Sequence, residues 1–253
     1  TNLNSNILKL LNFNLINIDI DDIKFNTINN FSLEVDNKFN INNVIINSNI
    51  NIDQLKYKKP YLINSYFSDI NDFILLKNHN LNLIYKDYNL TVKGEGEIKF
   101  NEETDQIKYL VNKKNKNLII SAELFLKNIN LKKQDFLKNF FPQINEHINL
   151  NNQKLKINYN NNNVSFSGSG KFKINKDFEE IDYLFEKKEN KTNFITKLNL
   201  KNTNFEIEDI NYKKKDKSNM LLKIEGEQSK NKNLTINTFL LNEEKNNIKI
   251  KNL

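Results

Sequence analysis

The sequence of 253 residues contains no cysteine, no tryptophan and no arginine, because all 38 basic residues are lysine. Without cysteine, the chain cannot form a disulfide framework, a cysteine-ligated zinc site, an iron–sulfur cluster or a cysteine nucleophile. Without arginine, it lacks the side chain that most often reads guanine, so the net charge of +7 does not indicate a nucleic-acid partner. No apolar run approaches the roughly 18 to 20 residues that a membrane-spanning helix needs.

Motifs for catalysis and metal binding are also missing. The two histidines, His79 and His147, have no second ligand at short spacing, and we expect both at the surface. There is no nucleophile elbow and no phosphate-binding loop, and the G-x-G strings lack the third glycine of a dinucleotide-binding loop. Acidic pairs that begin at Glu179 and Glu243 adjoin predicted turns, where charge is common. The sequence therefore predicts no catalytic residue, no metal site, no cofactor and no enzymatic activity.

Asparagine, with 53 residues, and lysine are the residues in excess. Both have A/T-rich codons, so the bias favours an A/T-rich genome over a functional cause. The lysines are scattered among glutamate and aspartate, which favours a solvated polar face over a binding patch. The chain begins at Thr1 without an initiator methionine or a signal peptide, and we expect it to be a segment of a longer polypeptide.

Apolar and polar residues alternate along most of the chain, which predicts β-strands with one apolar face. Residues 90–100, LTVKGEGEIKF, and residues 164–174, VSFSGSGKFKI, show this alternation most clearly. The other alternating segments are 15–20, 31–36, 41–57, 82–87, 106–111, 118–126, 153–159, 179–186, 193–200, 204–212, 219–228, 233–241 and 247–252. The sequence therefore predicts a mainly β fold, with a long antiparallel sheet of tandem amphipathic strands.

The two G-x-G strands belong to an internal repeat with a period of 74 residues. Residues 83–131 align with residues 157–205 without a gap, and the alignment places the two G-x-G motifs on each other. The chain has only five glycines, so a bias towards lysine and asparagine does not produce this match. A shorter echo, LKIEGE, lies at residues 222–227. We expect residues 1–253 to form one elongated domain that contains these repeats.

Two stretches show helical spacing instead of alternation. Residues 132–148 place Phe136, Phe140 and Phe141 at helical intervals, which predicts a helical insert of one or two short helices, with Pro142 kinking or ending the first. Residues 66–77 form a weaker helix candidate.

The strand glycines and the size of the sheet leave two questions open. Glycine on an apolar strand face marks either a bend or the floor of a ligand-binding hollow. Thirteen to fifteen strands, at about 4.8 Å each, would make a sheet about 60 to 70 Å wide. Such a sheet must close into a barrel, pack as a sandwich, or curl and keep its apolar lining for a ligand.

The tandem G-x-G strands, followed by strands with an I-x-Y core, resemble the AsmA-like family of envelope proteins. Ile107 with Tyr109, and Ile181 with Tyr183, carry this core. The closing segment, DINYKKKDKSNMLLKIEGEQSKNKNLTINTFLL, fits the same family pattern. The chain looks most similar to the YhdP-type branch, which is related in architecture to TamB. The resemblance covers residues from about 40 onward, and the excess of lysine and asparagine departs from the family.

The resemblance implies an open hydrophobic groove that carries phospholipid acyl chains between the inner and outer membranes, without catalysis. It also implies a periplasmic location, an inner-membrane anchor outside this segment, partners in both membranes and a role in outer-membrane biogenesis. The residues expected to line the groove are Leu90, Val92, Gly94, Gly96, Ile98, Phe100, Leu124, Leu126, Val164, Phe166, Gly168, Gly170, Phe172, Ile174, Leu198 and Leu200. A structural or adhesin-like β-repeat with a closed core is the alternative, and an enzyme on a β scaffold is a third.

Overall fold

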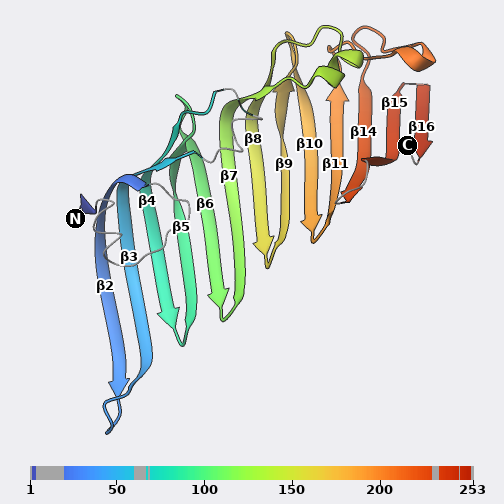
Figure 1. Ribbon diagram of the computed structural model, residues 1–253. Coiled ribbons are helices and arrows are strands. Elements are labelled where there is room, and N and C mark those ends of the chain that lie inside the picture. Colours follow the sequence, from blue (N-terminus) through green and yellow to red (C-terminus); the bar gives the residue numbers. More distant parts are fainter. Residues whose placement is uncertain are drawn as a thin grey trace. The chain divides into compact units, whose positions relative to one another are not determined.

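The computed structural model of the chain describes residues 2–3, 20–59, 67, 69–229, 234–244 and 246–251. Fourteen strands form one antiparallel sheet, whose order along the sheet follows their order along the chain (Figure 1). Each strand therefore pairs with the strands that precede and follow it in the sheet, as in an up-and-down meander. Among the described residues, no pairing joins the first strand to the last, so the sheet is not closed into a barrel. The predicted mainly β, antiparallel fold is confirmed.

The strands of this sheet are β1 Asn2–Leu3, β2 Ile20–Val35, β3 Ile41–Lys58, β4 Phe73–Lys86, β5 Asn89–Lys99, β6 Asp105–Lys114, β7 Asn117–Lys132, β8 His147–Asn160, β9 Asn163–Lys173, β10 Phe178–Lys188, β11 Lys191–Leu200, β14 Met220–Ser229, β15 Thr235–Glu243 and β16 Asn246–Lys251. Between β11 and β14 the chain forms a second, two-stranded sheet from β12 Glu206–Ile207 and β13 Tyr212–Lys213, with the 3-10 helix η3 Glu208–Ile210 between them.

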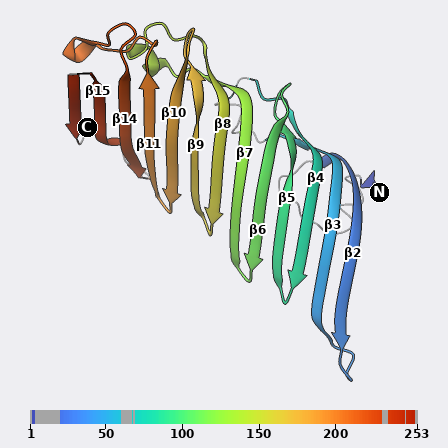
Figure 2. The same cartoon turned by 180° about the vertical axis from the view of Figure 1, so that it is seen from behind.

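The chain divides into two units by its internal packing, and each is described by itself. Unit 1 comprises the described residues of Thr1–Ile63, Asp69–Leu124 and Asn158–Asn161. Unit 2 comprises those of Asn64–Ser68, Phe125–Ile157 and Asn162–Leu253. Figure 2 shows the same strands from behind. Two-residue turns join β4 to β5, β6 to β7, β8 to β9 and β10 to β11.

Several asparagines adopt positive φ in hairpin turns and at irregularities within strands. The β8–β9 hairpin turns through Asn161 and Asn162, with φ of 43° and 74°, as the tight turns of hairpins require. Asn78 and Asn152, 74 positions apart, have φ of 50° and 51°. Asn78 lies at a break in the β4–β5 register, between Lys77 and Asn80. Asparagine tolerates this left-handed conformation better than other residues with a side chain, so part of its excess has a structural use.

The helix predicted at 66–77 is wrong, and the helical insert predicted at 132–148 is confirmed only as one short 3-10 helix. Of the candidate at 66–77, residues 73–77 lie in β4, and residues 66 and 68 lie outside the described part of the chain. Of the insert at 132–148, only Asp135–Asn139 is helical, as the 3-10 helix η2. Lys132 ends β7 and His147 begins β8, so the insert is a short loop with one tight turn.

Two predicted strands also differ from the structure. The segment 204–212 alternates in sequence but forms the short pair β12–β13 around η3, because it leaves the main sheet at the end of β11. The segment 15–20 lies outside the described residues except for Ile20, which begins β2.

Candidate functional site

The clearest candidate for a site is the apolar face of the sheet in unit 2. Register pairs place Phe166 of β9 opposite Phe185 of β10, and Phe185 opposite Phe194 of β11. Directly opposed side chains lie on the same face of a sheet. The three rings form a stacked row, with centroids 5.0 Å apart for Phe166 and Phe185 and 6.1 Å apart for Phe185 and Phe194. This row is called the aromatic band below.

The aromatic band is only partly covered. Phe185 is 39% exposed, and Phe166 and Phe194 are half-buried. Phe172, on the same strand and face as Phe166, is only 3% exposed. The described residues contain no second sheet besides the two-stranded pair β12–β13. The apolar face is therefore buried at one end and partly open along the band.

The reverse face of the same strands is polar. Alternation along β9 places Ser165, Ser167, Ser169 and Lys171 on that side. The neighbouring positions on β10 and β11 are mostly charged or polar too, with Leu184 and Ile195 as a half-buried apolar pair. The sheet is therefore amphipathic in cross-section, as the alternation predicts.

The strand glycines lie beneath side chains from neighbouring strands. A Cβ atom at Gly94 would lie 2.5 Å from Tyr109 Cζ, and one at Gly168 would lie 2.6 Å from Tyr183 Cε2. A Cβ at Gly96 would lie 2.8 Å from His79 Cα. In both repeats, the glycines leave room for a tyrosine from the next strand and for a polar side chain from the preceding one. Side chains of the protein itself thus fill the space that a hollow floor would have offered.

One end of the apolar face in unit 2 is covered by two chain segments, residues 133–146 and 201–219, which together are called the cap. Phe205 of the second segment packs between Phe140 and Phe141 of the first, with ring centroids 6.0 Å and 5.3 Å away. The backbone N–H of Glu206 donates to Phe140 O at 3.0 Å, which joins the two segments. Phe205 and Phe141 are buried, so the cap forms a closed core with the ends of the strands.

A buried carboxylate anchors the start of the second cap segment. Glu179, at the beginning of β10, is 5% exposed. Its oxygens accept hydrogen bonds from the backbone N–H groups of Lys201, Asn202 and Thr203 at 3.0, 2.6 and 2.8 Å. Three donors on one carboxylate turn the chain away from the sheet as soon as β11 ends.

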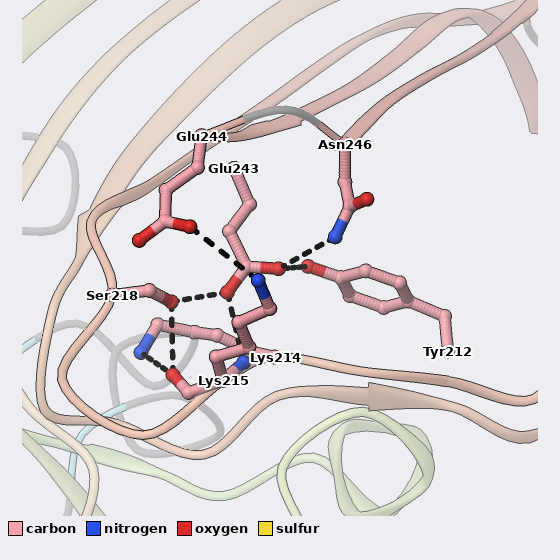
Figure 3. Close-up of polar contacts among 7 residues, drawn as sticks. All are labelled: Tyr212, Lys214, Lys215, Ser218, Glu243, Glu244 and Asn246. Atoms are coloured by element: carbon pink, nitrogen blue, oxygen red, sulfur yellow. Dashed lines mark hydrogen bonds and ion pairs between the residues drawn. The ribbon is translucent and has the colours of Figure 1, made fainter.

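A second buried carboxylate, Glu243 at the end of β15, holds the other side of the same segment (Figure 3). Tyr212 Oη donates to Glu243 at 2.7 Å, and the backbone N–H of Lys215 donates at 2.8 Å. Ser218 Oγ donates a further short bond, and Asn246 Nδ2 donates at 3.4 Å. Burial alone would raise the pKa of Glu243, but these hydrogen bonds outweigh it, so the pKa lies below its usual value.

Lys214 is a buried cation of the second cap segment. Its side chain is 5% exposed, and its Nζ donates to Lys201 O at 2.6 Å and to Lys215 O at 3.1 Å. Burial lowers the pKa of Lys214, while the charges of Glu243 and Glu179 act in the opposite direction. The buried side chains of Glu179, Glu243 and Lys214 thus bond to backbone groups and side chains of the cap, an arrangement that fastens a loop, whereas Thr203 Oγ1 is buried without a hydrogen-bond partner among the described residues. Within the described ranges, no group of three or more histidine, aspartate or glutamate residues is placed to hold a metal ion.

The predicted groove residues fall into both units. Those in unit 1 are Leu90, Val92, Gly94, Gly96 and Ile98 on β5, Phe100 after it, and Leu124 on β7. Those in unit 2 are Leu126 on β7, Val164, Phe166, Gly168, Gly170 and Phe172 on β9, Ile174 after it, and Leu198 and Leu200 on β11. Ile98, Leu126, Phe172, Ile174 and Leu200 are buried, and the other apolar side chains of this set are half-buried. Register pairing brings Gly170 of β9 and Leu198 of β11 onto one face through Ile181 of β10.

Several residues of this region were missed or misplaced by sequence reasoning. His79, expected at the surface, is 1% exposed, because it lies over Gly96. His147 is exposed, as predicted. Glu179 and Glu243, expected in solvated turns, are buried. One sequence signal was available, since Glu179 and the buried Asp105 are acidic residues 74 positions apart, each following a G-x-G strand.

In the part of the chain that the structure describes, no helix is long and apolar enough to cross a membrane. No protein-family model matches the chain, and neither a curated protein nor a solved structure matches it.

Proposed function

We propose that the chain binds phospholipid acyl chains, without catalysis, on the partly open apolar face of its sheet. The observation that carries this proposal is the aromatic band: Phe166, Phe185 and Phe194 stack in a row, yet Phe185 remains 39% exposed. Exposed apolar rows on an otherwise polar surface are typical of sites for apolar ligands.

The physics of such a face suits transport as well as binding. Each methylene of an acyl chain that leaves water contributes about 0.8 kcal/mol, so a bound lipid is held firmly. The attraction is non-directional, so the lipid can slide along the face at little cost compared with leaving it. The family resemblance extends the proposal to movement between the inner and outer membranes in the periplasm, with partners in both membranes.

The apolar face is closed at its capped end and partly open at the aromatic band. At the capped end, Phe205, Met220 and Leu241 form an ordinary closed core. The acyl chain would therefore occupy the aromatic band, between the cap and the hairpin ends. A closed structural repeat remains the competing function, and the capped end is the observation that favours it.

The substitution Phe185→Glu tests acyl-chain binding. An unpaired carboxylate facing an acyl chain is costly, so we expect co-purifying phospholipid, measured by native mass spectrometry and lipid extraction, to fall at least about tenfold. Leu184→Glu is the matched control, because Leu184 is the adjacent residue and lies on the polar face. It should keep the lipid.

Both variants are compared by thermal unfolding to confirm that they fold. A wild-type protein that purifies without lipid, or equal lipid loss in both folded variants, would contradict the proposal and favour the closed repeat. Phe172→Glu is unsuitable for this purpose, because Phe172 is buried and its replacement would break the core.

A further inference from the structure

Two hairpin tips of unit 1 expose aromatic side chains in an unusual backbone conformation. Phe39, at the tip of the β2–β3 hairpin, is 88% exposed and has φ of 61°. Tyr88, at the tip of the β4–β5 hairpin, is 81% exposed and has φ of 62°. Bulky side chains rarely adopt positive φ, and water disfavours their apolar surface. Both residues therefore lower the stability of the folded chain at these positions.

At the position that matches Tyr88 in the second repeat, the chain has a residue that adopts this conformation with less strain. The residue 74 positions after Tyr88 is Asn162, which has φ of 74° in the equivalent β8–β9 turn. Asparagine would satisfy the left-handed conformation in both tips, and the sequence contains 53 of them. Bulky residues retained in a strained conformation point to a function for the rings.

The loop around Phe39 is held together by hydrogen bonds to Asp36. The carboxylate of Asp36 accepts from the N–H groups of Lys38 and Asn40 at 2.8 and 2.9 Å. The backbone N–H of Phe39 donates to Asp36 O at 3.0 Å. The side chain of Asn40 also donates to the Asp36 carboxylate, at 2.8 Å, and this bond, followed by the two backbone bonds to the carboxylate, holds the pKa of Asp36 below its usual value. Phe39 is presented outward from a fixed support.

The β2–β3 hairpin is apolar on one side near its tip. β2 continues to Val35, whereas pairing of β3 with β4 begins only at Ile45, so the hairpin projects beyond β4. On one face of this projection, Leu33, Val35 and Ile41 are exposed by 46% to 61%. Phe31, on the same face of β2, is 77% exposed and lies just before the projection, opposite Ile46. Ser32, Glu34 and Asn42 alternate onto the other face.

The β6–β7 tip, at the same edge of unit 1, is basic. In a meander, alternate connections lie at the same end of the strands, so the β2–β3, β4–β5 and β6–β7 tips share one edge, which slants across the strands in Figure 1. The β6–β7 tip carries Lys113, Lys114 and Lys116, all exposed. None of the ion pairs found among the described residues involves these lysines.

From this edge we propose that unit 1 docks on the surface of an anionic lipid bilayer. Phe39 and Tyr88 insert their rings at the boundary between headgroups and acyl chains, and the β6–β7 lysines contact anionic headgroups. Aromatic side chains favour this boundary, and clustered lysines near it are attracted to anionic lipid. Phe39, Tyr88 and the lysines stand on three separate tips of one edge, and the surface of a bilayer can contact all three at once.

Vesicle co-sedimentation of the whole chain tests the docking surface. We expect binding to phosphatidylcholine vesicles that contain phosphatidylglycerol, and weaker binding to phosphatidylcholine alone. Phe39→Asn and Tyr88→Asn should each weaken binding to both kinds of vesicle about tenfold, because each removes an inserted ring. Replacing Lys113, Lys114 and Lys116 with glutamine should weaken only the binding to anionic vesicles, also by about tenfold or more.

The variants are chosen so that unfolding does not imitate the result. Asparagine suits the left-handed conformation, so Phe39→Asn and Tyr88→Asn should melt at or above the wild-type temperature. Phe136→Asn is the matched control, because it removes an exposed ring, 61% accessible, from unit 2. It should leave vesicle binding unchanged, as should Phe185→Glu, which makes this test independent of acyl-chain binding.

The absence of tryptophan from the chain permits a direct readout of ring insertion. In Phe39→Trp, the single tryptophan should shift its emission to shorter wavelength when vesicles are added, whereas Phe136→Trp should not shift. Docking is overturned if the wild type binds neither vesicle, or if the asparagine variants bind like the wild type. Self-association would also overturn docking. If the tryptophan emission shifts without vesicles and the asparagine variants convert an oligomer into a monomer, this edge of unit 1 binds a second copy of the chain.

Discussion

His79 and Gln153 occupy matching places 74 positions apart, and each donates a hydrogen bond to a carbonyl of the following strand. His79 Nε2 donates to Glu97 O at 2.8 Å, and Gln153 Nε2 donates to Lys171 O at 2.8 Å. Gln153 Oε1 also accepts a bond from Tyr183 Oη at 3.1 Å. His79 Nδ1, in contrast, has no hydrogen-bond partner within the described residues. His79 therefore leaves one ring nitrogen without a hydrogen bond, whereas both side-chain polar atoms of Gln153 are bonded.

We expect His79→Gln to preserve the fold and to remove a dependence of stability on pH. Burial lowers the pKa of His79 below 6.5, although the hydrogen bond to Glu97 O and the charge of Glu97 oppose this. A histidine with a lowered pKa binds its proton more readily in the unfolded state, so its stability contribution is full above pH 6.5 and falls as the pH drops below it.

Urea unfolding above and below pH 6.5 measures this effect. At the higher pH, His79→Gln should lie within about 1 kcal/mol of the wild type, because glutamine restores the hydrogen bond. At the lower pH, the wild type should lose more stability than the variant. His147→Gln, at an exposed position, is the control and should behave like the wild type. An equal loss in wild type and His79→Gln would show that His79 is not the titrating group.

At the scale of elements, the cap depends on buried carboxylates that accept hydrogen bonds from its second segment. Glu243→Gln should destabilise the protein by about 2 kcal/mol at neutral pH, since a neutral amide accepts weaker bonds and brings its own donors. The pKa of Glu243 is lowered below 4.5, so its contribution is present above that pH and is lost as the pH falls through the folded-state value. The difference between wild type and variant should therefore shrink in acid.

Glu244→Gln provides the matched control for this prediction. Glu244 is the next residue, with a side chain that is 55% exposed and an ion pair to Lys215 at 3.5 Å. Its replacement should change the free energy of unfolding, measured in urea, by less than about 0.5 kcal/mol at any pH. A similar loss in both variants would assign the effect to net charge instead of to the buried cluster.

The strands and hairpins were predictable because alternation reports directly on a sheet with one apolar face. The helix candidate at 66–77 failed because residues 73–76, FILL, are apolar in succession and the irregularity at Asn78 interrupts the alternation of β4. The candidate at 132–148 is helical only over Asp135–Asn139, for another reason. Phe140 and Phe141 are spaced for contact with Phe205, which lies 64 or more positions away, and sequence periodicity does not report such contacts.

The candidate site was predictable in part. The apolar positions of β9 follow from alternation, and the register then adds Phe185 and Phe194, whose place beside Phe166 depends on pairing between strands. The buried state of Glu179 was not predictable, because its partners are backbone N–H groups, which any sequence supplies. Glu243 accepts from the side chains of Tyr212 and Ser218, 31 and 25 positions away, and sequence periodicity does not report such contacts.

At the scale of the molecule, a meander transmits strain only between neighbouring strands, as in other repeat proteins. Gly168→Ala would place a Cβ against the ring of Tyr183, whose hydroxyl bonds to Gln153. Overpacking of this kind costs about 1 to 3 kcal/mol. Burial raises the pKa of Tyr183 to about 12, so its hydroxyl stays protonated and remains the donor to Gln153.

Hydrogen exchange measured by mass spectrometry should show which strands lose stability in Gly168→Ala. We expect Gly168→Ala to reduce amide protection in β8 to β11 of unit 2 and to leave β3 to β5 of unit 1 unchanged, because no register pair connects those strands directly. Ser169→Ala is the control, since Ser169 is exposed on the polar face and the substitution adds no volume. A uniform loss of protection in both units would mean that the whole sheet unfolds as one cooperative body, and the lipid-binding and membrane-docking substitutions would then have to be interpreted together.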